Sequence, residues 1–328
     1  MTTLVHVAVD GDAQSVTPRA GAEGDRLFQL LEDAAPSRLR LTRGPTAELP
    51  LEATILIGSR ITSELLRARP GLRTIIVPWA GIPQLLLDAI RDSGRENLLV
   101  RNIHHNAISA AETAVGLLLA AARGITSLDA DLRKHDWRQR YEPRVSLRLN
   151  GEKAVVLGRG AIGSRIQSAL LGLGMTVKML GRPPEQQDRW PSKSLAAHVH
   201  QAKALLIAVP AGPDTDGVVD AGVLDAMPGG IVVNVGRGSV LDEDAVYARL
   251  ADGRLFAAGI DVWWQIPAEE DARANTPPSR HPFHQLDNVV MTPHVGGGLG
   301  EAGIEAARAD AIGTILTELM ADDPAAVR

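Results

Sequence analysis

The amino-acid sequence predicts an α/β protein with two doubly wound parallel-sheet domains. Three observations predict this fold class. Short apolar runs of strand length alternate with helical patterns along most of the chain. A glycine-rich turn follows one of these runs at the middle of the chain and opens a helix. The length of 328 residues suits about two domains.

The first part of the chain alternates strands and helices. Helical patterns at 62–69 and 83–90 lie between apolar runs, which is typical of βαβ units with helices on both faces of a parallel sheet. A longer apolar helix is predicted at 107–122, and the polar segment 129–150 separates it from the next strand. The predicted strands are 4–9, 53–57, 75–77 and 98–100.

The middle of the chain carries the most specific local pattern. A predicted strand at 154–157 runs into Gly158-Arg159-Gly160-Ala161-Ile162-Gly163, and an apolar helix follows. A G-x-G-x-x-G turn between a strand and a helix indicates a dinucleotide-binding site. Gly158 makes the tight turn, Gly160 lets the backbone approach a pyrophosphate, and Gly163 allows close helix–strand packing. Because similar glycine turns also occur without a ligand, the flanking strand and helix are what support this interpretation.

Five more strands follow the glycine turn and complete the usual six strands of a dinucleotide domain. The first of them ends at Gly181-Arg182, where an NAD-binding protein usually carries an acidic residue for the ribose hydroxyls. The Arg182 guanidinium instead suits a 2′-phosphate, which predicts that NADP(H) is preferred over NAD(H). An Arg at such a place is also a common solvated surface residue. The five strands after the glycine turn are predicted at 177–180, 205–209, 231–235, 257–262 and 289–291. An irregular loop is expected at 264–282 and a last helix at 301–320.

Composition excludes several classes of protein. Acidic residues outnumber basic ones, 39 to 34, so the chain lacks the basic footprint of a nucleic-acid-binding protein. Without cysteine it has no disulfide and no thiolate nucleophile or metal ligand. The start Met1-Thr2-Thr3 lacks a signal peptide, and no apolar run is long enough to span a membrane, so we expect a cytoplasmic protein. His281 and His284 have an i, i+3 spacing, but no ligand framework surrounds them, and we expect no metal site.

Polar residues follow three strands of the predicted dinucleotide domain, at the edge where its glycine turn lies. His294 is a suitable proton donor or acceptor because imidazole titrates near neutral pH. Arg237 is suited to clamp a carboxylate with its planar fork and to polarise a carbonyl group. Asp261 could accept a hydrogen bond from a nicotinamide carboxamide. Alone, each is more often a surface or core residue, so their convergence supports a catalytic role.

Taken together, the motifs resemble the D-isomer-specific 2-hydroxyacid dehydrogenases, and the hydroxypyruvate and glyoxylate reductases among them. The resemblance implies a flavodoxin-like substrate domain, residues 1–101 and 296–328, split around an inserted Rossmann-like dinucleotide-binding domain, residues 102–295, with the active site in the cleft. The motifs that carry it are Asn106–Thr113, Gly158–Gly163, Val209-Pro210 with Thr215, Asn234–Glu243, Gly259–Val262 and Thr292–His294.

The resemblance also implies an activity and a set of site residues. A nicotinamide cofactor, held in part by Val209, Pro210, Thr215, Val235 and Gly236, would reduce a small-molecule 2-ketoacid to a D-2-hydroxyacid. Members are usually homodimers through the cofactor domain, and the segment 128–148, with Trp137 and Tyr141, resembles the arm used for this contact. The substrate-binding residues would be Trp79, Ala80, Gly81 and Asn106.

One departure from the family pattern bears on catalysis. Ile266 occupies the position of a Glu that pairs with the catalytic histidine, and Gln265, Glu269 or Glu270 would have to replace it. Without a carboxylate partner, we expect a lower pKa for His294. A formate- or phosphite-type dehydrogenase and a non-catalytic nucleotide-sensing protein are the alternative functions.

The tryptophans leave one further question open. Trp79, Trp263 and Trp264 suggest either an apolar or bulky substrate side chain or packing within the protein.

Overall fold

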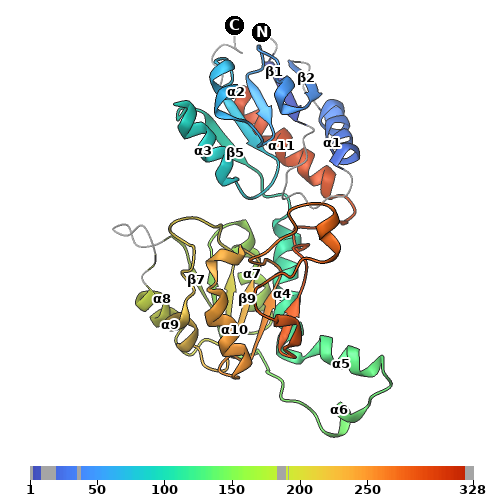
Figure 1. Ribbon diagram of the computed structural model, residues 1–328, viewed down its shortest axis with the longest axis vertical. Helices are drawn as coiled ribbons and strands as arrows, with labels where there is room; N and C mark the ends of the chain where they lie inside the picture. The colour runs from blue at the N-terminus through green and yellow to red at the C-terminus, as the bar shows by residue number, and fades with distance from the viewer. Residues whose placement is uncertain (1–2, 9–19, 35–37, 183–189, 191, 322–328) are drawn as a thin grey trace. The chain divides into compact units, whose positions relative to one another are not determined.

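The computed structural model describes residues 3–8, 20–34, 38–182, 190 and 192–321 (Figure 1). The chain divides into two compact units. Unit 1 comprises Met1–Asn106 and Gly298–Arg328, and unit 2 comprises Ala107–Gly297. The predicted domain borders, after residue 101 and before residue 296, each lie a few residues earlier in the chain than the observed borders, after Asn106 and before Gly298. Each unit contains one parallel sheet covered by helices, which confirms the predicted fold class.

Unit 1 has a five-stranded sheet in the order β2-β1-β3-β4-β5, and each strand is parallel to its neighbours. The order 2-1-3-4-5 is the strand order of flavodoxin-like folds. The strands are β1 (Thr3–Ala8), β2 (Leu39–Gly44), β3 (Ile55–Ile57), β4 (Thr74–Val77) and β5 (Leu99–Asn102). The helices are α1 (Ala20–Ala34), η1 (Thr46–Glu48), α2 (Ser63–Ala68), α3 (Gln84–Ser93) and α11 (Ile304–Ala321).

Alternation along the strands of unit 1 determines which helices cover each face of the sheet. Val5 of β1 packs in one cluster with Leu31 of α1 and Ile312 of α11. Its neighbour Leu4 packs in the opposite cluster with residues of α2 and α3, such as Leu86. Successive side chains of a strand point to opposite faces, so a run of buried residues binds helices on both sides.

Unit 2 has a six-stranded sheet in the order β11-β10-β9-β8-β6-β7. Its strands are β6 (Lys153–Leu157), β7 (Thr176–Leu180), β8 (Ala204–Ile207), β9 (Ile231–Asn234), β10 (Ala257–Ile260) and β11 (Val289–Met291). Its helices are α4 (Ala107–Arg123), α5 (Ile125–Leu132), α6 (Arg138–Tyr141), α7 (Ala161–Gly172), α8 (Ser192–Val199), α9 (Ala221–Asp225), η2 (Gly238–Val240), α10 (Glu243–Ala251), η3 (Asp271–Ala274) and η4 (Phe283–Gln285).

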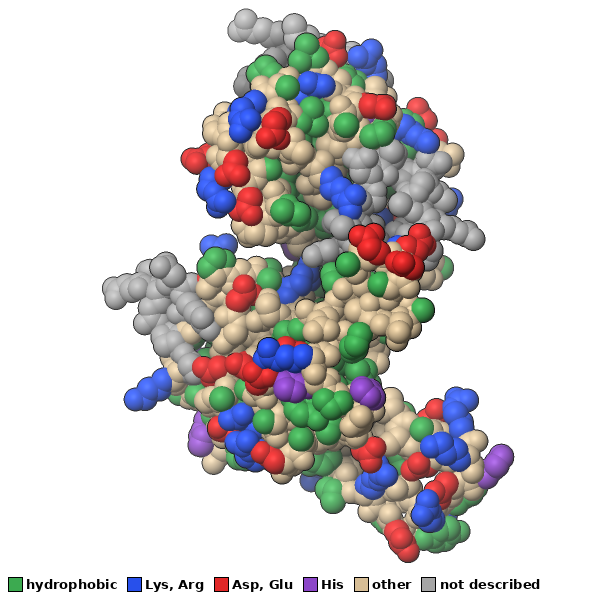
Figure 2. All heavy atoms as spheres, viewed as in Figure 1, with side chains coloured by type: hydrophobic (Ala, Val, Ile, Leu, Met, Phe, Trp, Pro, Cys, Tyr) green, Lys and Arg blue, Asp and Glu red, His purple; other side chains and the backbone are tan. Residues whose placement is uncertain are grey.

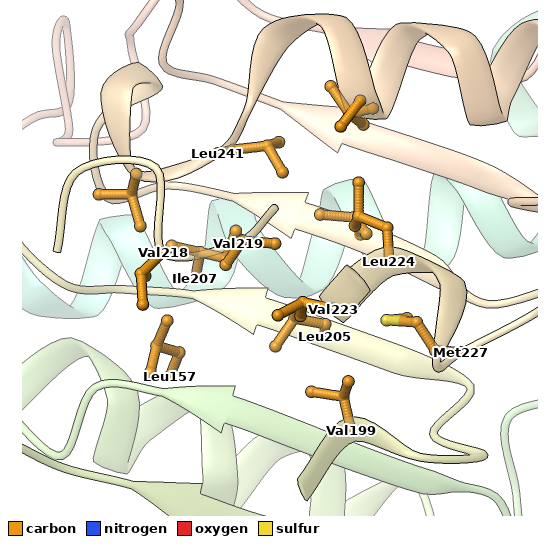
Figure 3. Packing of buried hydrophobic residues seen from close by; sticks show 14 of the residues in the cluster. Leu157, Val199, Leu205, Ile207, Val218, Val219, Val223, Leu224, Met227 and Leu241 are labelled. Atoms are coloured by element: carbon orange, nitrogen blue, oxygen red, sulfur yellow. The ribbon is translucent and has the colours of Figure 1, made fainter. Parts of the chain in front are cut away.

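The core of unit 2 also lies on both faces of its sheet. One cluster joins Leu157 and Leu205 of the sheet to Val199, Val223 and other residues of α8, α9 and α10 (Figure 3). The other cluster lies under α4 and α7. Burying one such aliphatic side chain stabilises the fold by about 1.5–3 kcal/mol. These two layers support the strand ends at which the predicted site residues lie.

Trp263 and Trp264 pack inside unit 2. The Trp263 Nε1 donates to Thr292 O at 2.9 Å, and the Trp264 Nε1 donates to Leu241 O at 2.9 Å. The Phe283 ring lies 5.6 Å from Trp264, stacked, and 5.7 Å from Trp263, edge-on. These contacts favour packing over substrate binding for the two tryptophans, and they anchor the start of the segment between β10 and β11.

The polar segment between α4 and β6 contains two short helices, α5 and α6, which extend away from the sheet of unit 2 (Figure 1). Trp137 is 60% exposed and Tyr141 is 76% exposed in this segment. Among the described helices, none is by itself long and apolar enough to cross a membrane, and the one pair that has this length and composition, α4 with α5, is bent by 65°.

Candidate active site

The glycine turn lies where the strand order of unit 2 reverses, because β6 pairs with both β7 and β8. A Cβ at Gly163 would lie 2.0 Å from Gly158 O, and one at Gly158, whose φ is +124°, would lie 2.6 Å from Ala208 O. Neither position therefore admits a side chain. A Cβ at Gly160 would meet nothing within 4 Å, so its backbone faces open space next to the start of α7. This turn fits the phosphates of a dinucleotide.

Two arginines lie at the carboxyl end of β7. The Arg159 Nη2 donates to Met179 O at 3.2 Å, and its Cδ lies 3.0 Å from where a Gly181 Cβ would be. Arg182 is exposed and has no hydrogen bond or ion pair with the described part of the chain. Residues 183–189 lie outside the described residues. The strand end therefore presents two guanidinium groups where an NAD-binding protein usually has a carboxylate.

The loop after β8 is tied to the loop that carries Arg237. Within the first loop, the Thr215 Oγ1 donates to Pro210 O at 2.6 Å. The Ser239 Oγ donates to Asp216 Oδ1 at 2.5 Å, and Gly217 N donates to Ser239 O at 2.6 Å. The predicted cofactor residues of this loop thus keep a defined position relative to Arg237.

A tight turn after β9 presents Arg237. The buried Asn234 side chain spans this turn: its Oδ1 accepts from Gly236 N and its Nδ2 donates to Arg237 O, both at 3.0 Å. A Cβ at Gly236 would lie 2.5 Å from Val209 O, and one at Gly238 would lie 2.4 Å from Trp263 O. The Asn and the two flanking glycines are therefore the residues that this close packing requires.

The Arg237 guanidinium is half-buried without a counter-ion. Its Nη1 donates to Gly236 O at 2.7 Å, and burial lowers its pKa. No Asp or Glu in the described residues forms an ion pair with Arg237. Burying a charge is costly unless a partner offsets the lost solvation, so this group is suited to bind an anion.

Asp261 holds the loop that carries His294. The Asp261 carboxylate is only 2% exposed and accepts three hydrogen bonds. Its Oδ1 accepts from Thr292 Oγ1 at 2.7 Å and Val295 N at 3.0 Å, and its Oδ2 accepts from Gly296 N at 3.0 Å. His294 lies between these donors with a φ of +58°, a conformation that few non-glycine residues adopt. Asp261 therefore orients the histidine, and its bond to a nicotinamide carboxamide stays a prediction.

Burial and the positive charge of Arg237 lower the pKa of His294, in that order of importance, and the negative charge of Asp261 opposes them. Arg237 follows β9 and His294 follows β11, and both strands pair with β10, so the two residues lie at the same carboxyl edge of the sheet. A cationic side chain suited to bind an anion and a titratable histidine thus occur together in unit 2.

The predicted substrate residues lie at the corresponding edge of unit 1. Trp79, Ala80 and Gly81 follow β4, and Asn106 follows β5. The Asn102 Nδ2 donates to Ala80 O, which joins the two segments. His105, which the sequence does not assign to the site, is half-buried beside Asn106, with its Nδ1 atom fully buried. Its neighbour His104 is exposed. The sequence alone does not indicate which of these two adjacent histidines faces the interior of unit 1.

Comparison with known proteins decides the family. A family model described as D-isomer specific 2-hydroxyacid dehydrogenase, NAD binding domain, matches residues 115–296. The chain belongs to this family. Its resemblance to these dehydrogenases, predicted from the motifs, is thereby confirmed.

Two curated relatives and one solved structure illustrate the family. The chain is 32% identical over 263 residues to D-3-phosphoglycerate dehydrogenase of Mycobacterium tuberculosis, a match that covers 78% of this chain and 47% of the relative. The chain thus spans about half the length of such relatives. It is 25% identical over 286 residues to hydroxypyruvate reductase of Thermotoga maritima, covering 85% and 90% of the two chains. An NADPH-dependent glyoxylate/hydroxypyruvate reductase of Sinorhizobium meliloti shares the fold, with 22% identity, a TM-score of 0.69 and coverage of 98% and 95%.

Gln265, Glu269 and Glu270 are the predicted replacements for the family's Glu, but none of the three affects the pKa of His294. Ile266 itself is 49% exposed. Glu270 pairs with Arg273 at 2.9 Å, and the side chains of Gln265 and Glu269 are exposed. Among the described groups, Asp261 is the one acid that raises the pKa of His294. The pKa is lowered overall, as expected for a histidine without the family's carboxylate partner.

His281 and His284 have different surroundings in the structure. The His281 Nε2 lies 2.6 Å from Asp244 Oδ1, and its ring stacks on Tyr247 at 4.6 Å. His284 is exposed. In the part of the chain that the structure describes, no group of three potential metal-binding side chains comes together.

Proposed function

We propose that this chain is a nicotinamide-dependent reductase that converts 2-ketoacids to D-2-hydroxyacids. The observation that carries this proposal is the half-buried, unpaired guanidinium of Arg237 beside His294. A 2-ketoacid supplies the carboxylate that Arg237 lacks and an adjacent carbonyl oxygen that must gain a proton. No other arrangement in unit 2 offers both functions at the edge where its glycine turn lies, as far as the described residues show.

The chain's own residues would bind the substrate and move the proton. A bound nicotinamide cofactor supplies the hydride for the keto carbon. Arg237 would hold the carboxylate with its fork and stabilise the negative charge that develops on the carbonyl oxygen. Protonated His294 would donate its proton to that oxygen, giving the hydroxyl group. Asn234 and Asp261 would keep the two side chains in position through the hydrogen bonds described above.

An assay of NADPH oxidation tests the proposal. Glyoxylate, hydroxypyruvate, pyruvate and phenylpyruvate are offered as substrates, and formate and phosphite are offered with NADP⁺. We expect turnover of at least one 2-ketoacid. Turnover of formate or phosphite alone would favour the alternative dehydrogenase class. Tight cofactor binding without any turnover would favour a nucleotide-sensing protein.

We propose that NADPH is preferred over NADH, because two arginines and no described acid lie at the end of β7. The change Arg182→Ala should lower kcat/KM for NADPH by roughly tenfold to a hundredfold, since a charge-assisted bond to the 2′-phosphate is lost. The value for NADH should change little. Initial rates with each cofactor measure this effect. Arg123→Ala, at an exposed arginine at the end of α4, is the control and should affect neither cofactor.

The lowered pKa of His294 predicts a pH dependence. Only protonated histidine can donate, so kcat/KM for reduction should fall as the pH rises through a value below 6.5. Ile266→Glu should restore a nearby negative charge, raise this pKa, and move the fall to higher pH by about one unit or more. Rates measured from pH 5 to 9 follow the shift. The neutral control Ile266→Gln should keep the original profile, and an identical profile for both variants contradicts the expectation that a charge at position 266 acts on His294.

We propose that the exposed arm formed by α5 and α6 joins two copies of the chain. Trp137 and Tyr141 of this arm expose much apolar surface, which is unusual for side chains without a partner. A homodimer would bury them. Light scattering coupled to size-exclusion chromatography should give twice the mass of 34.8 kDa, and Trp137→Glu should shift the protein toward one copy.

A further inference from the structure

Trp263 contacts the loops of both proposed catalytic residues. It follows β10 and begins the irregular segment that leads to β11. Its carbonyl group packs against Gly238, the residue directly after Arg237, so closely that a Cβ at Gly238 would collide with it. Its indole Nε1 donates to Thr292 O at 2.9 Å, two residues before His294. One residue thus joins the turn after β9 to the loop after β11.

The bond from the indole is important because of the residue that follows Thr292. Pro293 has no backbone N–H, so Thr292 O is the one hydrogen-bonding group of the peptide bond between them. Trp263 supplies the donor for this oxygen. The peptide groups on either side are fixed by bonds to Ile260 O and to the Asp261 carboxylate. Without the indole N–H, the peptide bond that leads into the loop of the histidine would lose this support.

Packing holds the Trp263 ring in place. Phe283 lies edge-on at 5.7 Å, and Trp264 lies edge-on at 6.2 Å. The ring packs against the hydrophobic cluster on the face of the sheet that α8, α9 and α10 cover. Hydrophobic side chains reach the surface of unit 2 in several places (Figure 2), so partial exposure of the indole does not by itself indicate a ligand. A ring held in this way is suited to keep a backbone group in position.

We infer that Trp263 is a positioning residue that sets the placement of His294 relative to Arg237. This inference rests on the proposed function and deepens it, because one substrate can receive a proton and be bound as a carboxylate only if the two side chains keep a fixed separation. Two charged groups act on the imidazole: Arg237, which follows β9, and Asp261, which follows β10. Burial and Arg237 outweigh Asp261, so a loop that loses its support should let the pKa of His294 rise toward the ordinary 6.5.

The variant Trp263→Phe tests the inference, because it removes the N–H and keeps an aromatic ring. The loss of this hydrogen bond should lower kcat for 2-ketoacid reduction by roughly threefold to thirtyfold. KM should change little, since Arg237 still binds the carboxylate. The pKa of His294 should rise by roughly half a unit. NMR of isotope-labelled histidine rings, titrated from about pH 4 to pH 9, measures this pKa, and the signal missing in His294→Asn identifies the residue.

Trp264→Phe is the matched control. The Trp264 Nε1 also donates to a backbone carbonyl at 2.9 Å, that of Leu241, and the side chain is half-buried like that of Trp263. Both variants lose one bond of equal length, so their unfolding temperatures should fall by similar amounts. Trp264→Phe should leave kcat and the pKa of His294 unchanged, because the Asn234 side chain holds the turn after β9 independently.

A combined variant separates positioning from general damage. In His294→Asn, the addition of Trp263→Phe should lower the remaining rate no further, because the side chain that is positioned is already gone. A further fall in this variant, an equal pKa shift in both tryptophan variants, or an unchanged pKa and kcat in Trp263→Phe overturns the inference. The expected pKa shift, in a chain that turns over no 2-ketoacid, overturns the proposed function and leaves the positioning of His294 by Trp263 standing.

Discussion

Arg237→Met is expected to lower kcat/KM for 2-ketoacid reduction by roughly a thousandfold or more while leaving the protein as stable as before, or more stable. The activity falls because the substrate carboxylate loses its cationic partner and the carbonyl oxygen loses its polarising group. Stability is kept because the guanidinium is partly desolvated and has no counter-ion in the described residues. Removing an unpaired, partly buried charge relieves a desolvation cost.

Arg249→Met provides the matched control. Arg249 lies in the same unit and is 8% exposed, but it forms two bonds with Asp225, of 2.8 Å from Nε to Oδ1 and 2.6 Å from Nη2 to Oδ2. Its loss should lower the free energy of unfolding by about 1–3 kcal/mol and leave the activity of the folded protein unchanged. Rates and thermal unfolding of the two variants are compared.

Arg237→Lys separates charge from geometry. Lysine keeps the positive charge but lacks the planar fork, so we expect a rate between those of the methionine variant and the unmodified protein. If Arg237→Met instead loses stability as Arg249→Met does and keeps its activity, Arg237 has a structural role and the proposed function loses its main support.

The fold could be predicted to a large extent because its strands are buried. Runs such as Val155 and its neighbours are apolar on both faces, and the structure places them under helices on both sides of the sheet. β2, which pairs with β1 at the edge of the sheet, has no counterpart among the predicted strands. Arg40, Thr42 and Arg43 interrupt its apolar pattern, and its burial is partial. An edge strand lacks the continuous hydrophobic signal on which the prediction depends.

The part of the site that lies within sequence motifs could be predicted, whereas the part that depends on spatial neighbours could not. The glycines around Arg237 and the Asn234 bridge explain why this motif is visible in one sequence: each residue type meets a steric or hydrogen-bonding requirement. The unpaired state of Arg237 and the burial of His105 depend instead on what surrounds them in space. Short-range spacing carries no information about such contacts. Trp79 and Asn106 are predicted from the motifs, but their buried, unpaired polar atoms and that of His105 are visible only in the fold.

His294→Asn is expected to lower kcat for reduction by about a hundredfold to ten-thousandfold, the usual contribution of a general acid. Asparagine is the appropriate replacement because His294 has a φ of +58°, which Asn tolerates better than Ala or the β-branched residues. The loop should therefore keep its three hydrogen bonds to Asp261. The affinity for NADPH, measured by fluorescence titration, should stay within a few-fold of the original.

The pH profile of this variant identifies the proton donor. If His294 donates the proton, the remaining activity of His294→Asn should no longer fall through a value below 6.5 as the pH rises, because the titrating group is gone. Thr292→Val is the companion variant: it removes one bond to Asp261 but keeps the imidazole, so any loss of rate arises from positioning alone and its pH dependence should persist. An unchanged profile in His294→Asn, together with substantial activity, would assign proton transfer to another group and leave His294 a substrate-orienting residue.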